Sequence, residues 1–336
     1  MKERSVIFLK KKLILILSVF MLTYVISDSY SKEKSVFALA GHDYVLGGSV
    51  VGIKLYSKGI IVVDFEDSDN CPALRAGLRR GDTIISAGGT EVTDTDSFLY
   101  AVAASGGKLP ITFERGGKII SSELIPECDP SGRLLAGMWV RDSVGGVGTV
   151  TFYSPSEGKM VTLGHPVTDS DTGKSFTVQS GVITGCEILS VGRSTPGAPG
   201  EIFGRFADEE NVLGQITENT ERGLYASAAK IPDDPVYMKI APASEVKSGG
   251  ALLYSDIRGN GVEPYTVSIQ KLYSSSGSDL LVKITDQRLL DFSGGIVQGM
   301  SGSPIVQSGK IAGALTHVFL DDPTSGYGIY SEKMAA

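Results

Sequence analysis

Short apolar runs, separated by turns rich in glycine, proline and polar residues, dominate the chain beyond residue 134. The runs have the length of β-strands and follow one another closely, and no heptad or helical repeat interrupts them. Many short strands at this spacing are typical of a closed barrel or a pair of barrels. This part of the chain is therefore predicted to be a closed all-β structure.

A more mixed pattern covers residues 41–127. Two strand-like runs, "SVVGIKLYS" and "GIIVVDFED", come before a short helix, and a second helix is predicted in "DTDSFLYAVAASGG". Asp94 or Asp96 supplies the N-cap oxygen of this second helix. A glycine-turned hairpin follows, so the pattern predicts a compact α+β unit.

The segment "PALRAGLRRGDTIISAGGTEV" in this unit resembles the central signature of a PDZ domain. The resemblance implies that residues 41–127 capture an extended peptide by strand addition, with a carboxylate-binding loop near Gly48–Ile53. The peptide-binding residues that it implies are Gly52, Ile53, Lys54 and Leu55. The alternative is a PDZ domain that only packs on its neighbour. The linker "ECDPSGRLLAG" separates the unit from a second domain, residues 134–336.

The N-terminal segment, residues 1–40, has a different character. Lys10–Lys12 precede an uncharged apolar run, Leu13–Ile26, which is shorter than the roughly 20 residues of a membrane span and matches the apolar region of a signal peptide. Ala38–Ala40 has the small-x-small form of a cleavage site. We expect this segment to direct export, either cleaved or retained as a membrane anchor.

Composition narrows the range of functions. A chain of 336 residues is long enough for about two domains, and its formal charge of −7 argues against a nucleic-acid partner. The three cysteines form neither a disulfide framework nor a metal-binding spacing, and there is no His-Glu-x-x-His motif. We therefore expect no metal and no cofactor.

The densest run of small residues, Gly299–Pro304, lies inside "GGIVQGMSGSPIVQSGKIAGALTHV". Glycine weakens a strand, so such a run marks a turn or a close backbone approach. It can present the hydroxyl of Ser301 beside exposed backbone N–H groups, as acyl transfer requires. Ser303 is a rival nucleophile, but its place before Pro304 suits the start of a strand. An ordinary Gly/Ser/Pro hairpin is the alternative.

A serine nucleophile needs a base, and the chain has only three histidines. His165, in "LGHPVTD", follows a strand and precedes a polar turn, where a ring can be fixed and still reach solvent. His317 lies in the apolar run "AGALTHVFL" and is predicted to be a core residue, and His42 belongs to another unit. His165 is the predicted base, with a pKa near that of an unperturbed imidazole.

A carboxylate should orient this histidine. The candidates are Asp142, Asp169, Asp171, Asp286 and Asp291. Asp169 and Asp171 are close enough to His165 to cap its turn instead. Asp286 ends a predicted strand shortly before the serine turn and is favoured, although spacing alone leaves the choice open.

Three motifs together resemble the SpoIVB peptidase family of endospore-forming bacteria: "LGHPVTD", "TDQRLL" and "GGIVQGMSGSPI". The likeness extends from the N-terminal segment to "DDPTSGYGIY" and covers nearly the whole chain. It implies a chymotrypsin-like double β-barrel after the PDZ domain, with a catalytic triad of His165, Asp286 and Ser301. By analogy, the N–H groups of Gly299 and Ser301 form the oxyanion hole. Pro166 stands where the family often has glycine.

The resemblance also implies a biological role. It is that of an exported serine endopeptidase of sporulation, sent across the forespore membrane into the intermembrane space and either anchored there or released. Its protein substrate would be a membrane-bound regulator, whose cleavage frees an intramembrane protease that activates the late mother-cell sigma factor. The alternative is a non-catalytic PDZ–barrel scaffold at the membrane that binds the same regulator.

Overall fold

The structure is a computed structural model that describes residues 43–66, 70–207, 211–228, 230–272 and 279–336. The predicted export segment, residues 1–40, and His42 lie outside the described residues. Within the described ranges, no helix has the length and the apolar character that crossing a membrane requires.

Strands of the first barrel form a closed ring. They are β2 (Val50–Phe65), β9 (Met138–Ser154), β10 (Lys159–Thr162), β11 (Val178–Val191), β13 (Val212–Thr220) and β14 (Gly223–Ala228). β2 pairs with β9, β9 with β10, β10 with β14, β14 with β13, β13 with β11, and β11 with β2 again. Val51, Ile53 and Ile183 contribute to the core inside this ring. Closure leaves no free edge in the ring.

A second ring is formed by strands near the C-terminus. They are β16 (Gly249–Ser255), β17 (Glu263–Lys271), β18 (Leu280–Ile284), β19 (Pro304–Gln307), β20 (Lys310–Val318) and β21 (Ser325–Tyr330). They pair in the order β16–β17–β18–β21–β20–β19 and back to β16. Along β17, Tyr265, Val267 and Ile269 point inward and alternate with exposed neighbours, as the two-residue period of a strand requires.

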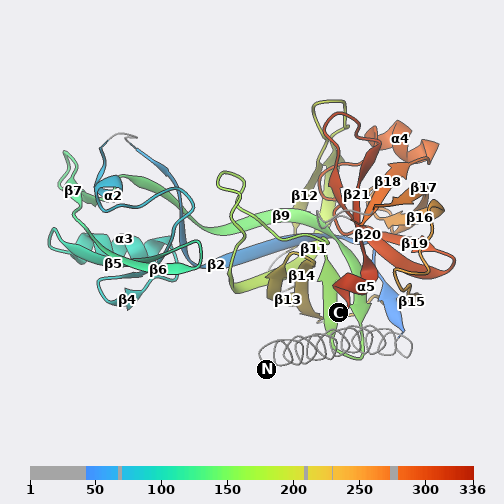
Figure 1. The fold of residues 1–336 in the computed structure, drawn as a ribbon, viewed down its shortest axis with the longest axis horizontal. Helices are drawn as coiled ribbons and strands as arrows, with labels where there is room; N and C mark the ends of the chain where they lie inside the picture. The colour runs from blue at the N-terminus through green and yellow to red at the C-terminus, as the bar shows by residue number, and fades with distance from the viewer. Residues whose placement is uncertain (1–42, 67–69, 208–210, 229, 273–278) are drawn as a thin grey trace, which may run out of the picture.

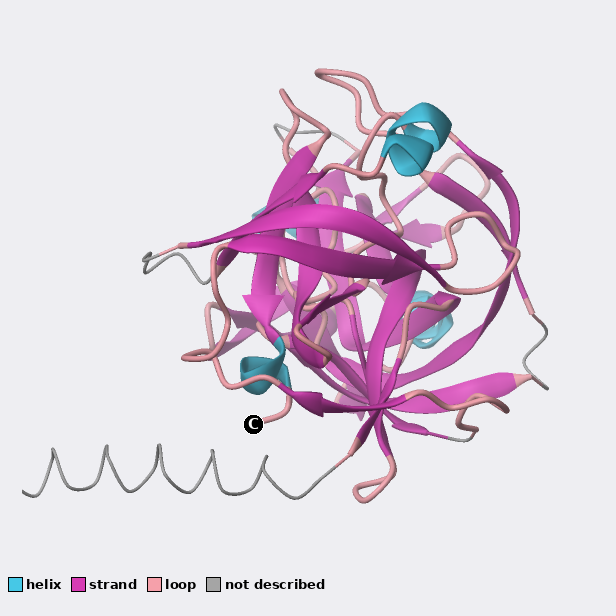
Figure 2. Ribbon diagram, turned by 90° about the vertical axis from the view of Figure 1, so that its right-hand side faces the viewer, coloured by secondary structure: helices cyan, strands magenta, loops and turns pink. Residues whose placement is uncertain are grey.

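Two short strands join the barrels. β1 (Tyr44–Leu46) pairs with β9 of the first barrel and with β15 (Tyr237–Ile240), which in turn pairs with β20 of the second. The remaining elements are β12 (Ile202–Phe206), which pairs with β11, and the helices α4 (Gln287–Ser293) and α5 (Ser331–Met334). Figure 2 shows how strands dominate this part of the molecule. The predicted mainly β fold with a chymotrypsin-like double barrel is confirmed.

The PDZ unit, residues 58–142, projects from the first barrel on the ribbon formed by β2 and β9 (Figure 1). Its elements are the outer parts of β2 and β9, with α2 (Pro72–Arg75), β3 (Thr83–Ala87), β4 (Thr90–Glu91), α3 (Thr95–Ala104), β5 (Leu109–Arg115), β6 (Lys118–Leu124), β7 (Glu127–Cys128) and β8 (Leu134–Leu135). Phe98, Val102 and Phe113 anchor its separate core. As predicted, Asp94 caps α3 by accepting from the Ser97 N–H.

The predicted domain boundaries need correction. The sequence placed residues 41–127 in the PDZ domain, but Tyr44–Leu46 and the first half of β2 belong to the barrels. The predicted linker "ECDPSGRLLAG" forms the β7–β8 hairpin of the PDZ unit. The PDZ unit is therefore an insertion between the first two strands of the first barrel's ring, because β2 leads into it and β9 leads out.

The predicted peptide-binding edge, Gly52–Leu55, is also wrong. These residues pair with β11 on one side and with β9 on the other, so their N–H and C=O groups are not available to an added strand. The equivalent open edge is Met138–Arg141 of β9, which among the described strands pairs with β2 alone and lies beside α3. Exposed Leu99 and Trp139 lie on α3 and on this edge.

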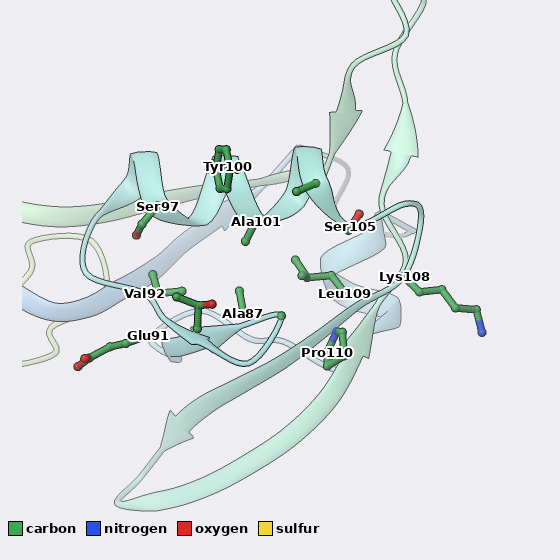
Figure 3. Close-up of a pocket in the computed structure, with 13 residues that line it drawn as sticks. Ala87, Glu91, Val92, Ser97, Tyr100, Ala101, Ser105, Lys108, Leu109 and Pro110 are labelled. Atoms are coloured by element: carbon green, nitrogen blue, oxygen red, sulfur yellow. The ribbon is translucent and has the colours of Figure 1, made fainter.

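A separate cavity of about 480 Å³ lies between α3 and the start of β5 (Figure 3). One wall is formed by Ser97 and Ala101 of α3 and by Ser105, which follows the helix, while Leu109 and Pro110 close the opposite side. None of its lining residues belongs to β9, so it lies on a different face of α3 from the open edge.

Candidate active site

Ser301 lies on a tight turn between α4 and β19. Gly299 (φ +100°) and Gly302 (φ +97°) flank it in the left-handed region, which glycine adopts without strain. A Cβ atom at Gly302 would collide with the carbonyl oxygen of Thr149 and the nitrogen of Leu163. Glycine is therefore required there, because the turn lies directly against the backbone of the first barrel.

Strand β9 holds this turn at both ends. The Thr149 N–H donates to the Ser301 carbonyl at 2.9 Å, and the Thr149 hydroxyl donates to the Gly299 carbonyl at 2.8 Å. The Gly302 N–H donates to the carbonyl of Leu315 in β20. The side chain of Met300, within the turn, is fully buried and holds the turn in place. The carbonyl oxygens of Gly299 and Ser301 thus already accept hydrogen bonds. Contacts with both barrels fix the conformation of the turn.

The backbone N–H groups of Gly299 and Ser301, unlike the carbonyl groups of the same turn, are not hydrogen-bonded to any residue in the described part of the chain. Two free donors beside a serine hydroxyl are the arrangement that stabilises the oxyanion of acyl transfer. The donors are the two residues that the sequence predicts.

The hydroxyl of Ser301 donates to the carbonyl oxygen of Thr316 at 2.5 Å. It is partly exposed to a cavity of about 440 Å³ between the two barrels. Ser303, the rival nucleophile, is fully buried and its hydroxyl has no hydrogen-bond partner among the described residues. Access therefore favours Ser301 over Ser303.

His165 lines the same cavity from the first barrel. It follows β10 after two left-handed residues, Leu163 (φ +68°) and Gly164 (φ +73°), which turn the chain toward β20. Its Nδ1 lies 2.8 Å from the carbonyl oxygen of Pro166. A carbonyl can only accept, so Nδ1 carries the proton and Nε2 is left as the proton acceptor. The backbone of Pro166 thereby fixes the tautomer that a general base needs.

His317 is not the core residue that the sequence predicts. It is exposed near the end of β20, lines the cavity, and its ring centroid lies 4.6 Å from that of His165. Burial, together with the charge of His317, lowers the pKa of His165 to about 4, below that of an unperturbed imidazole. The only sequence signal for this position is the polar turn that follows the strand.

Asp286, the predicted third member of a triad, lies outside the cavity. Its carboxylate caps α4, accepts from the N–H of Thr266 at 3.1 Å and pairs with Arg288 at 2.9 Å. The hydrogen bond from Arg288 is the main reason why its pKa falls to about 2. The structure brings Ser301 and His165 to one cavity, but it does not bring Asp286 to His165.

The other candidate carboxylates are also engaged elsewhere. Asp142 accepts from the Thr95 N–H, Asp169 and Asp171 pair with Arg141, and Asp291 accepts from Gln287 within α4. None of them lines the cavity. In this geometry, a backbone carbonyl does the orienting that the sequence assigns to a carboxylate.

The role of Asp286 can be tested by Asp286→Asn. Asparagine has a single acceptor oxygen, whereas the cap at the Arg288 N–H and the bond from the Thr266 N–H use different oxygens of the carboxylate, so one of the two bonds is lost. The variant should therefore lose about 1–2 kcal/mol of stability and keep kcat within about tenfold. Replacing a triad aspartate by asparagine instead lowers kcat by about 10⁴-fold. Steady-state kinetics with thermal unfolding as a control separates the two outcomes, and a loss of the larger size would return Asp286 to the triad.

Residues 192–202 support the serine turn, which sequence reasoning did not anticipate. The Ser194 hydroxyl donates to the Ile296 carbonyl at 2.6 Å, and the Gln298 N–H donates to the Gly200 carbonyl. The guanidinium of Arg193 binds the last carbonyls of α4, those of Leu290, Asp291 and Phe292. The motif "GRSTPGAPGEI" therefore cradles the segment that leads into Ser301.

Comparisons with known proteins match both parts of the chain. The family model of SpoIVB peptidase S55 matches residues 132–335, and a PDZ-domain model matches residues 68–115. A search of curated proteins gives no significant match.

Three solved structures are similar to parts of this chain. The PDZ domain of the SdrC-like protein from Listeria monocytogenes is 21% identical, covering 25% of this chain and 87% of its own, with a TM-score of 0.22. Rv3671c from M. tuberculosis H37Rv, in an inactive serine-to-alanine form, is 11% identical over 56% of this chain and 78% of its own, with a TM-score of 0.30. The serine protease AL20 from an extremophilic microorganism is 12% identical over 57% and 88%, with a TM-score of 0.34. Since the S55 match alone spans more than half of the sequence, this chain belongs to the SpoIVB peptidase S55 family and is a serine peptidase with a PDZ domain.

Proposed function

We propose that this peptidase is an exported endopeptidase of sporulation that cleaves a membrane-bound regulator between the two membranes of the developing spore. Cleavage would release an intramembrane protease and so activate the late mother-cell sigma factor. The observation that carries the proposal is the cavity that holds Ser301, two free backbone N–H groups and His165, whose Nδ1 lies against the Pro166 carbonyl. The S55 family supplies the biological context, and the N-terminal segment supplies the route out of the cytoplasm.

The proposed mechanism begins with the Ser301 hydroxyl leaving its acceptor on Thr316 and turning toward Nε2 of His165. Nε2 takes the proton as Oγ attacks the scissile carbonyl, and the N–H groups of Gly299 and Ser301 bind the oxyanion. The imidazolium then protonates the leaving amine, and a water molecule hydrolyses the acyl-enzyme by the same steps. The Pro166 carbonyl keeps the imidazole in one orientation throughout.

The cavity also limits which peptide side chains fit. Its wall is largely apolar, with Ile53, Val147, Leu163, Val297 and Val318 among the lining residues, and the described residues that line it include no carboxylate and no lysine or arginine. Burial of an apolar side chain is therefore the main source of affinity available next to Ser301. We propose that the enzyme cleaves beside an uncharged apolar residue.

The PDZ unit would hold the regulator at a second place. The open edge Met138–Arg141 offers main-chain hydrogen bonds to an extended segment, and Leu99 and Trp139 offer apolar contacts. This edge replaces the Gly52–Leu55 site predicted from the sequence.

A serine-directed phosphonate tests the catalytic part of the proposal. The probe should modify Ser301 covalently, and mass mapping should find the adduct on the peptide that contains this turn. The extracytoplasmic segment of the regulator should be cut by the unmodified protein and left intact after labelling. A protein that binds the regulator but neither reacts with the probe nor cuts the segment would be the non-catalytic scaffold.

A further inference from the structure

The loop that follows His165 is attached to the PDZ unit. Residues 167–176 form a compact hairpin whose base is fixed by Asn219, which bonds the backbone of Val167 and Phe176. At its tip, Asp169 is completely buried and accepts from the N–H and hydroxyl groups of Thr172. The start of this hairpin lies two residues from His165, so its position determines where the imidazole lies.

Arg141 makes the main contact with this hairpin from the other side. Its guanidinium pairs with Asp169 and, at 2.7 Å, with Asp171. Burial raises the pKa of Asp169, but the hydrogen bonds from Thr172 and Arg141 outweigh it, so the pKa is lowered and the carboxylate stays charged. A planar guanidinium that binds two carboxylates at once holds both in a fixed geometry.

Two further PDZ residues reach the same hairpin. The ammonium group of Lys174 donates to the Thr83 hydroxyl at 2.5 Å, and Arg80 donates to the Asp171 carbonyl at 3.3 Å. The hairpin that continues from His165 is therefore bound by β3 and by the turn before it, as well as by β9. Arg141 is the only one of these three PDZ residues that pairs with the buried carboxylate.

Arg141 also lies at a junction within β9. The open edge Met138–Arg141 ends at this residue. Further along the same strand, Val144 and Val147 line the cavity, and Thr149 holds the Ser301 turn. One strand thus runs from the PDZ edge, past the His165 hairpin, to the candidate nucleophile.

We propose that Arg141 is a positioning residue of the peptidase: through Asp169 and Asp171 it fixes the hairpin that places His165 against Ser301. The proposal rests on the proposed proteolytic function of this cavity. The PDZ unit is then part of the machinery that orders the general base, because it supplies the cation that the buried carboxylate requires.

The test compares Arg141→Gln, Arg141→Lys and a matched control in the full chain. Arg205→Gln removes another arginine of an ion pair, with Glu187 on an exposed hairpin away from the cavity, and should leave kcat and KM unchanged. Arg141→Gln should lower kcat by about 10- to 100-fold with KM changed less than threefold, since a misplaced base affects the reaction more than substrate binding. Arg141→Lys should restore part of the loss, because one ammonium can still pair with Asp169.

A readout that does not depend on turnover keeps this proposal separate from the proposed function. In NMR spectra, the Cε1–H resonance of His165, assigned with His165→Gln, should shift in Arg141→Gln and stay in place in Arg205→Gln. If the parent protein cuts no peptide, the proposed function fails while this resonance still reports on Arg141. An unmoved resonance, or an Arg141→Gln variant that melts earlier but has the parent kcat per folded molecule, would overturn the positioning role.

Discussion

Replacing Ser301 by alanine should lower kcat/KM for peptide hydrolysis by about 10⁴- to 10⁶-fold, the range that loss of a serine nucleophile produces. The fold should be unaffected, because within the described part of the chain the hydroxyl makes a single hydrogen bond, to the Thr316 carbonyl, and is partly exposed. Residual activity should come from the oxyanion donors and substrate binding, which the variant retains. Steady-state kinetics and thermal unfolding of the purified variant measure both effects.

Ser303→Ala is the matched control for this prediction. Ser303 is two residues away, fully buried, and has an unpaired hydroxyl among the described residues. Removing an unsatisfied buried polar group is neutral or slightly stabilising, so the variant should keep its activity and its melting temperature. Activity that survives in Ser301→Ala but is lost in Ser303→Ala would move the nucleophile to Ser303.

His165→Ala should cost a similar factor, about 10⁴-fold or more in kcat/KM, because serine and histidine act as one unit. The pH profile of the parent enzyme gives a second measurement. The base works as a neutral imidazole, and burial lowers the pKa of His165 to about 4. Activity should therefore stay level as the pH falls below 6.5 and decline only near pH 4, provided that circular dichroism shows a folded protein.

His317→Gln separates the two neighbouring rings. The charge of His317 lowers the pKa of His165, so its removal should move the acid limb of the profile upward while leaving a working base. A limb at pH 6–7 in the parent enzyme would instead indicate an imidazole in water. Full activity in His165→Ala would remove His165 from the mechanism altogether.

The barrel strands could be predicted from local sequence patterns. Buried and exposed positions alternate within a strand, as in β17, and this alternation is visible in the strand's own residues, so the mainly β fold could be predicted from the sequence. The domain limits could not. β2 runs without a break from the first barrel into the PDZ unit, and nothing in "VVGIKLYSKGIIVVDF" marks where its partner changes from β11 to β3. The change depends on the partner strands, and one of them, β11, lies more than a hundred residues away in the sequence.

The prediction of the peptide-binding edge was wrong for the same reason. Whether a strand has a free edge depends on what pairs with its two sides, and the partners of Gly52–Leu55 come from β9 and β11. The sequence of an edge strand and that of a strand paired on both sides can be alike. Only the closed ring of the barrel shows that this stretch is unavailable to a peptide.

By itself the sequence determined the chemistry that needs special local backbone: glycines around an exposed serine, and a histidine at a strand end. These features follow from steric rules that act within a few residues, and the structure places Ser301 and His165 in one cavity. What only the tertiary structure decided is what surrounds them: the Pro166 carbonyl at Nδ1, His317 beside the ring, and Asp286 held away at the start of α4. Such contacts depend on how the two barrels pack together. The sequence around a carboxylate or carbonyl oxygen does not show which donor group that oxygen will bind.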